Sequence, residues 1–148
     1  MRLQGAAQMR YFGFLIYDIR LWVRETVDAG NWAGKTLALE LLYARRLSGR
    51  EIARRSLAEM RRQAEIAAPQ AERWLSAMQT SFPDIRAGDR ICGLHKPTSG
   101  AEFFVNGRAG HHIAEPEFSR LFFGIWLSPQ SSEPGLREKL LGAAHARD

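Results

Sequence analysis

Three tyrosines are the residues of this chain best suited to make polar contacts inside an apolar cleft. Tyr11 and Tyr17 belong to the aromatic segment 11–23, and Tyr43 ends the alternating segment 36–43. On a half-buried sheet, a tyrosine presents an apolar ring and a hydroxyl that can hydrogen-bond to a ligand. The competing interpretation is that these rings only edge a filled core, as partly buried tyrosines often do.

A guanidinium group would complete such a cleft. Arg61 and Arg62 lie near the end of a predicted helix, 49–66. Either could hold a carboxylate through a forked pair of N–H groups. The sequence therefore predicts a ligand site for a small apolar carboxylate, formed by Tyr11, Tyr17, Tyr43, Arg61 and Arg62.

Metal and phosphate chemistry lack their usual residues. His111 and His112 are neighbours in a predicted strand, so they point to opposite faces and cannot chelate one ion together. The only cysteine is Cys92, and no spacing of cysteines and histidines indicates zinc. The glycines at 107–110 belong to a predicted hairpin, and no helix follows directly to form a phosphate loop. We predict no metal and no cofactor.

The pattern of apolar residues predicts an α+β domain spanning residues 1–148. Strands are predicted at 2–10, 11–23, 36–43, 90–95, 101–105 and 108–113, and helices at 49–66, 69–81, 116–127 and about 134–143. Strands follow strands without a β-α-β rhythm, which favours an antiparallel sheet with helices on one face. Asn106-Gly107 predicts a type I′ hairpin turn. Segment 11–23 is apolar on both faces, so we expect cover on both of its sides.

The charge distribution gives no sign of a nucleic-acid site. The net charge is +5, from 21 basic and 16 acidic side chains. The arginines alternate with glutamates on the predicted helices, which is typical of a solvated face. No segment approaches the ~20 apolar residues of a membrane span. As the chain is given we expect a cytoplasmic protein, or an exported one if the true start lies upstream, and its oligomeric state stays open.

Several motifs, in their order and spacing, resemble the chalcone isomerase-like family. They are Phe-Gly-Phe-Leu-Ile-Tyr-Asp-Ile-Arg-Leu-Trp at 12–22, Phe-Pro-Asp-Ile-Arg-Ala-Gly-Asp at 82–89, Phe-Phe-Val-Asn-Gly at 103–107 and Phe-Phe-Gly-Ile-Trp-Leu-Ser-Pro at 122–129. The resemblance covers nearly the whole chain and is closest to the bacterial branch. It implies an open-faced β-sandwich, in which an antiparallel sheet has helices layered on one face. It also implies one of two activities, closure of a chalcone to a flavanone or binding of a fatty acid between sheet and helices.

The donors that the resemblance associates with chalcone closure are not matched here. It implies an arginine before the aromatic strand, a threonine within it, and a tyrosine-asparagine pair after the first helix. This chain has Arg2 as its only nearby arginine, Phe12 near the threonine position, and Gln63 without a tyrosine after the helix. We therefore predict no catalytic residue and a protein that binds a small apolar anion such as a fatty acid. There are two alternatives. One is an isomerase, of the intramolecular lyase type, acting on an enone or chalcone-like substrate, and the other is a protein-interaction module.

Overall fold

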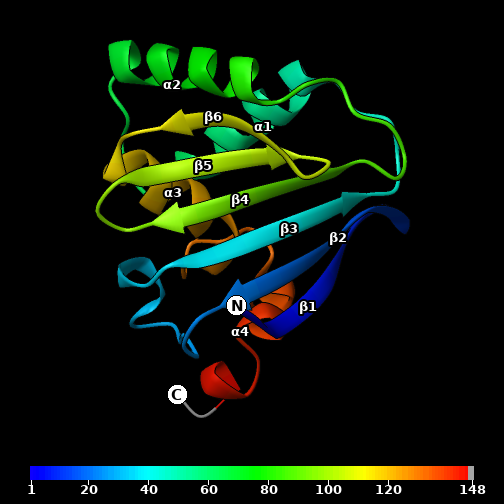
Figure 1. The fold of residues 1–148 in the computed structure, drawn as a ribbon, viewed down its shortest axis with the longest axis vertical. Helices are drawn as coiled ribbons and strands as arrows, with labels where there is room; N and C mark the ends of the chain where they lie inside the picture. Colours follow the sequence, from blue (N-terminus) through cyan, green and yellow to red (C-terminus); the bar gives the residue numbers. More distant parts are fainter. Residues whose placement is uncertain (147–148) are drawn as a thin grey trace.

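An antiparallel sheet organises the described residues of the molecule (Figure 1). The computed structural model describes residues 1–146, with side chains described through residue 142. The six strands lie side by side in chain order: β1 Arg2–Tyr11, β2 Phe14–Val23, β3 Leu37–Tyr43, β4 Arg90–Lys96, β5 Gly100–Val105 and β6 Arg108–Ile113. Each strand pairs antiparallel with the next. This order confirms the prediction from consecutive strands without intervening crossovers.

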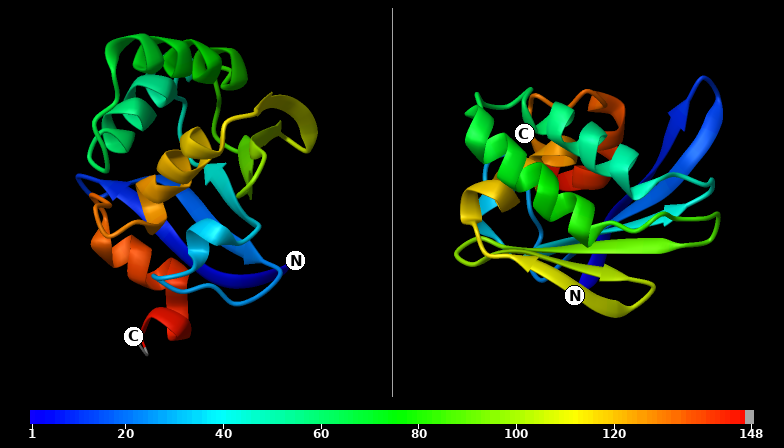
Figure 2. Two further views of the ribbon diagram at one scale, coloured as in Figure 1. Left: turned by 90° about the vertical axis from the view of Figure 1, so that its left-hand side faces the viewer. Right: turned by 90° about the horizontal axis from the view of Figure 1, so that it is seen from above.

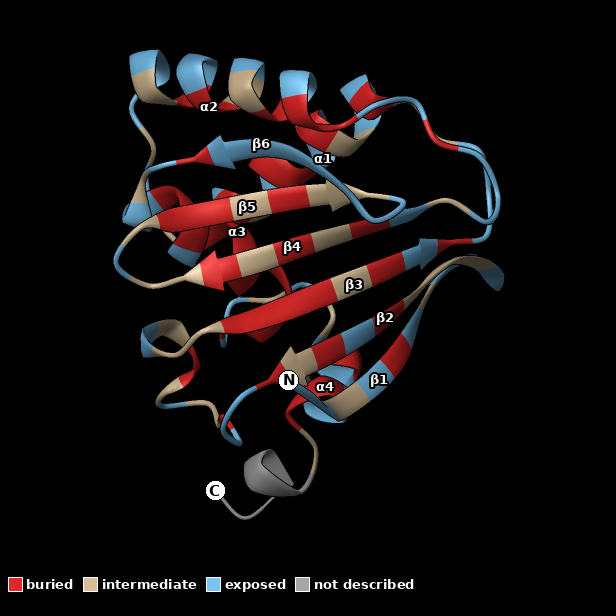
Figure 3. Ribbon diagram, viewed as in Figure 1, coloured by how far each residue is buried: buried red, intermediate tan, exposed pale blue. Residues whose placement is uncertain are grey.

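Four helices pack on one face of the sheet (Figure 2). They are α1 Gly49–Met60, α2 Ala68–Ser81, α3 Pro116–Leu127 and α4 Pro134–Ala146, and the short 3-10 helix η1 spans Trp32–Gly34. Helix α3 is buried along nearly its whole length, whereas α2 exposes its outer side (Figure 3). The α+β open-faced architecture is thus confirmed. Helix α1 begins as predicted, with the Glu51 N–H donating to the Ser48 hydroxyl, but it ends at Met60 and not at 66.

Alternation along the strands separates a core face from an open face. On β2 the side chains of Ile19, Leu21 and Val23 are fully buried beneath the helices. The intervening Arg20 is exposed and Trp22 is half-buried. No element within residues 1–146 packs over this second face, as the edge view of the sheet makes plain (Figure 2). The expectation of cover on both sides was therefore wrong.

The predicted long strand 11–23 is two strands joined by a tight turn. Phe12 and Gly13 both have positive φ, 49° and 81°, and they connect β1 to β2. Asn106 and Gly107 adopt almost the same values, 50° and 82°, between β5 and β6. Two positive φ angles define the type I′ hairpin turn. The predicted turn at Asn106-Gly107 is confirmed. The prediction of an unbroken strand through Phe12 was wrong, because phenylalanine carries no turn signature.

Candidate ligand-binding site

A cavity of about 340 Å³ lies between the core face of the sheet and helices α1 and α3. Its floor comes from alternating inward residues of β2 to β5, which are mostly apolar: Tyr17, Leu39, Leu41, Tyr43, Ile91 and Phe103. Helix α3 contributes a wall that includes Phe122 and Trp126, and α1 contributes the opposite wall. The size lies within the range of small-molecule sites. The space between the two layers is thus not completely filled by side chains.

A bulge in β2 places Ile16 beside Tyr17 on the cavity side. The pairing of β1 with β2 shifts by one residue between Met9 and Arg10, because Tyr17 lies opposite Met9 but Leu15 lies opposite Arg10. Ile16 is therefore an extra residue on β2, and a bulge allows adjacent side chains to share one face. Both Ile16 and Tyr17 line the cavity.

The Tyr17 and Tyr43 rings form a pair across β2 and β3. The two residues are direct antiparallel partners, and their ring centroids lie 5.5 Å apart in an edge-to-face arrangement. Burial raises the pKa of Tyr17 to about 12 and also raises the pKa of Tyr43. Both phenols therefore keep their protons at neutral pH, so each remains a hydrogen-bond donor.

Neither phenol uses its proton in a bond to a described side chain. The Tyr17 oxygen accepts a hydrogen bond from Trp126 Nε1 at 2.9 Å, which leaves its own O–H available. Tyr43 as a residue is buried, and its hydroxyl has no partner among residues 1–142, but its oxygen is not fully enclosed, because Ser128 Oγ is the one enclosed unpaired side-chain oxygen in that range. The Tyr43 hydroxyl is therefore reached from the cavity that the residue lines. The two phenols thus place available O–H donors in a mostly apolar lining.

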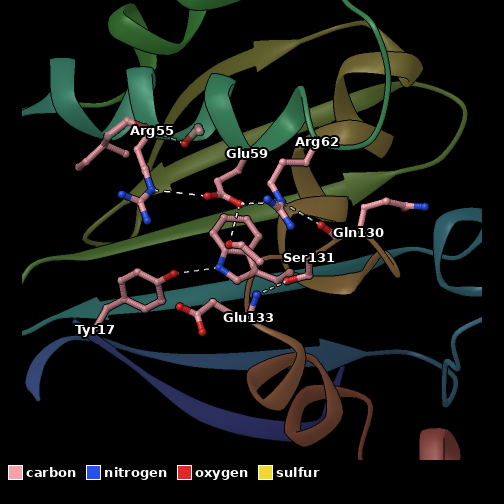
Figure 4. Close-up of polar contacts among 11 residues, drawn as sticks. Tyr17, Arg55, Glu59, Arg62, Gln130, Ser131 and Glu133 are labelled. Carbon is pink, nitrogen blue, oxygen red and sulfur yellow. Dashed lines mark hydrogen bonds and ion pairs between the residues drawn. The ribbon is translucent and has the colours of Figure 1, made fainter. Parts of the chain in front are cut away.

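Charged residues of α1 and of the segment before α4 surround the cavity mouth (Figure 4). Arg55 Nε lies 3.6 Å from the Glu59 carboxylate. Glu59 also accepts a hydrogen bond from the Ser132 hydroxyl at 2.7 Å and lies 3.8 Å from Arg62. Glu133 lines the cavity as well, and its charge contributes to the raised pKa of Tyr17. The mouth thus combines one cavity-lining guanidinium with several carboxylates.

The predicted site residues do not all meet in the cavity. Tyr11, Tyr17 and Tyr43 belong to its lining, with Tyr11 at the exposed rim. Arg61 is exposed beyond the end of α1, and Arg62 donates to the Gln130 carbonyl oxygen at 3.1 Å, so neither lines the cavity.

The arginine that does line the cavity is Arg55, which the sequence reasoning missed. Ile52, Arg55, Ser56 and Glu59 share one face of α1 by their spacing, beside the buried stripe that includes Leu57. This spacing was the available signal. A helix face can be read from the sequence, but the face that borders an empty space depends on packing.

The positions compared with chalcone closure lie outside the cavity lining. Arg2 hydrogen-bonds to Thr26 at the opposite end of the β1–β2 hairpin. Phe12 is exposed at the hairpin turn. Gln63 donates to the Leu121 carbonyl oxygen at 2.7 Å.

Residues 1–146 also bear on metal binding and on membrane insertion. No group of three or more His, Cys, Asp or Glu side chains comes together there in a way that could hold a metal ion. No helix in that part is both long and apolar enough to cross a bilayer.

The chain is similar to known proteins in sequence and in fold. An uncharacterized protein of Haemophilus influenzae is 28% identical over 138 residues, which are 93% of this chain and 66% of that protein. A fatty-acid binding protein of Arabidopsis thaliana has the same fold, with a TM-score of 0.71 at 12% identity over 95% of this chain and 86% of that one. A family model described as chalcone isomerase-like matches residues 1–142. Because that match spans nearly the whole chain, the protein belongs to the chalcone isomerase-like family.

Proposed function

We propose that this protein binds a small apolar carboxylate, such as a fatty acid, in the cavity between the sheet and helices α1 and α3. The observation that carries the proposal is an apolar cavity of about 340 Å³ that holds two protonated tyrosine hydroxyls and has Arg55 at its mouth. The fold shared with a fatty-acid binding protein of Arabidopsis thaliana is consistent with it.

The apolar walls would supply most of the affinity. Each methylene of a ligand that leaves water contributes roughly 0.8 kcal/mol. Phe103, Phe122 and Leu41 offer such surface without any polar group to desolvate. Specificity for the head group must then come from the few polar atoms in the lining.

Arg55 is the group that would meet the carboxylate. Its present partner, Glu59, also interacts with Arg62 and Ser132. Glu59 would therefore remain neutralised if Arg55 turned to a ligand. Glu133, whose charge acts on Tyr17, would repel a carboxylate from its own side of the mouth. The head group is thus expected between Arg55 and the Tyr17 hydroxyl, which the Arg55 charge reaches, with the acyl chain directed along the apolar floor and walls.

Displacement of a fluorescent fatty acid, dansyl-undecanoate, by dodecanoate tests this proposal. We expect Arg55→Gln to weaken dodecanoate binding about tenfold, because a hydrogen bond to a charged group contributes roughly 1.5–3 kcal/mol. Arg50→Gln is the matched control, since Arg50 is an exposed residue of the same helix, outside the lining and outside the contacts of Glu59 with Arg55 and Arg62. Dodecanol, which has no charge, should lose no affinity on Arg55→Gln.

Two results would contradict the proposal. One is a wild-type protein from which dodecanoate displaces no probe. The other is equal weakening by Arg55→Gln and Arg50→Gln, because the effect would then come from overall charge and not from the cavity.

The tyrosine pair also favours a second candidate, an isomerase acting on an enone. Two O–H donors in an apolar cavity can stabilise the enolate oxygen that develops when a phenolate adds to an enone. Loss of chalcone absorbance on incubation with the protein, abolished in Tyr17→Phe and Tyr43→Phe, would support it. Binding is preferred here because Arg2, Phe12 and Gln63 lie outside the cavity.

A further inference from the structure

The tip of the β1–β2 hairpin exposes three aromatic side chains. Tyr11, Phe12 and Phe14, here called the aromatic tip, are 53%, 86% and 61% exposed. The Tyr11 and Phe12 rings lie against each other, with centroids 4.5 Å apart. Single exposed apolar residues are ordinary on a protein surface, but a contiguous group of large ones marks an interaction site. The hairpin itself bends away from the other strands (Figure 2).

Turn chemistry does not account for Phe12. Its φ of 49° lies in the left-handed region, where a bulky side chain is strained. The other hairpin of the same sheet places Asn106 at a φ of 50°, followed likewise by glycine. Asn-Gly is the preferred pair for this turn. The hairpin therefore accepts a strained residue at its tip and gains an exposed aromatic ring.

Arginines surround the aromatic tip. The Arg45 guanidinium lies 4.9 Å from the centroid of the Phe14 ring. Arg10 spans the turn by donating to the Gly13 carbonyl oxygen at 3.3 Å. Arg46 follows Arg45 and is also exposed. None of these three forms an ion pair with a side chain in residues 1–142. The tip therefore combines apolar rings with uncompensated positive charge.

The aromatic tip is continuous with the cavity mouth. Tyr11 belongs both to the tip and to the cavity lining. Met9 and Ile16, from the two strands of the same hairpin, line the cavity as well. A surface that engaged the tip would therefore lie beside the opening through which a ligand enters.

We propose that the aromatic tip docks on an anionic lipid bilayer. Aromatic rings are favoured at the boundary between headgroups and acyl chains, where one part is apolar and the other wet. Arginines next to the rings would contact anionic headgroups, whose negative surface potential attracts basic residues. The positive charge of the tip favours a bilayer over a flat apolar protein surface, and its exposed rings favour a bilayer over an acidic protein surface. Its continuity with the cavity mouth also suits a bilayer, from which an apolar ligand could enter. The docking does not depend on what the cavity holds.

Flotation with lipid vesicles tests the docking, using the whole chain without added ligand. We expect the protein to bind vesicles of phosphatidylcholine and phosphatidylglycerol, to bind phosphatidylcholine alone much less, and to dissociate as salt increases. Phe12→Asn should weaken binding by at least about tenfold, because it removes the most exposed ring. It should also preserve or improve the fold, since it gives this turn the Asn-Gly pair of the other hairpin.

Matched controls lie at the opposite end of the same hairpin. Leu3 is 46% exposed near the start of β1, and Leu3→Ser should leave vesicle binding unchanged.

Arg45→Gln should weaken binding about fivefold, the effect of one basic residue near an anionic surface. Arg24→Gln removes an equal charge from an exposed residue beyond the far end of β2 and should have little effect.

Three outcomes would overturn the docking proposal. The first is the absence of binding to anionic vesicles, and the second is a Phe12→Asn protein that binds them as the wild type does. The third is self-association of the wild type, measured by sedimentation and lost in Phe12→Asn, without vesicle binding. Dodecanoate displacement in vesicle-free solution should be unchanged in Phe12→Asn, so failure of the docking and failure of the fatty-acid proposal are distinguishable.

Discussion

Trp126 Nε1 donates a hydrogen bond to the Tyr17 hydroxyl oxygen over 2.9 Å, joining helix α3 to strand β2 across 109 residues of sequence. The bond occupies one lone pair of the phenol and leaves its proton for another acceptor. It thus orients a donor inside an otherwise apolar cavity, and it ties the wall of the cavity to its floor.

We expect Trp126→Phe to weaken dodecanoate binding severalfold and to lower the free energy of unfolding by about 1 kcal/mol, the usual contribution of one hydrogen bond. Ligand displacement and urea unfolding measure the two effects. Trp22→Phe is the matched control, because Trp22 Nε1 also bonds to a side chain, Glu40, at 3.2 Å but on the open face of the sheet. Equal losses of affinity in the two variants would disprove the role of the Trp126–Tyr17 bond in the site.

Filling the cavity should remove binding without harming the fold. Ser56 lines the cavity from α1, and its hydroxyl bonds only to the Ile52 carbonyl oxygen of the same helix, at 2.7 Å. We expect Ser56→Leu to abolish dodecanoate binding and to preserve or raise the unfolding temperature, since the new side chain enters empty space.

Ser81 provides the contrast to Ser56. Its hydroxyl makes the same type of bond within α2, to the Ala77 carbonyl oxygen at 2.8 Å, and it is buried outside the cavity lining. Ser81→Leu should therefore overpack the core and lower stability by about 1–3 kcal/mol. A loss of stability in Ser56→Leu as large as that in Ser81→Leu would mean that the cavity is filled in solution.

Acid should destabilise the fold through His95. This buried residue places Nε2 2.8 Å from the Ala33 carbonyl oxygen and Nδ1 2.6 Å from the Ser119 hydroxyl. Nε2 must donate to the carbonyl, and in the neutral ring, which a lowered pKa favours, Nδ1 accepts from Ser119. Burial lowers the pKa of His95 below its ordinary value of 6.5.

The unfolded chain therefore takes up a proton at His95 before the folded protein does. We expect the free energy of unfolding to fall as pH drops from about 6.5 toward the lowered pKa, and this contribution to be constant above that window. Urea unfolding across a pH series measures the slope. His95→Gln should flatten the slope, whereas His112→Gln, an exposed residue of β6, should preserve it. A slope unchanged in His95→Gln would assign it to other groups.

Helix α4 should depend on a glycine in β1. A Cβ added at Gly5 would overlap the Leu140 carbonyl oxygen, a backbone atom that cannot move independently of the helix. We expect Gly5→Ala to lower stability by about 2 kcal/mol or more by displacing α4. Gly34→Ala is the control, because a Cβ at Gly34 would meet nothing within 4 Å. Equal unfolding temperatures of the two variants would contradict the close packing of β1 on α4.

The sequence by itself determined the elements whose residues carry local signals. The spacing of apolar residues in 116–127 matches α3 residue for residue, and Asn106-Gly107 forms the predicted turn, because these signals act within a few positions. Alternation in segments 11–23 and 36–43 also allowed Tyr17 and Tyr43 to be grouped in one predicted cleft, since side chains in a strand change sides at every step. The family motifs depend on order and spacing, which are properties of the sequence as well.

The tertiary structure decided the turn at Phe12 and the arginine at the cavity mouth. Phenylalanine favours strands, so only the pairing of β1 with β2 reveals that Phe12 turns the chain. Arg55, and not Arg61 or Arg62, borders the cavity because α1 ends at Met60 and because the rotation of α1 against the sheet follows from its contacts with α2 and α3. Whether the space beside it is filled depends on how the layers pack side chain by side chain, which no local pattern of residues specifies.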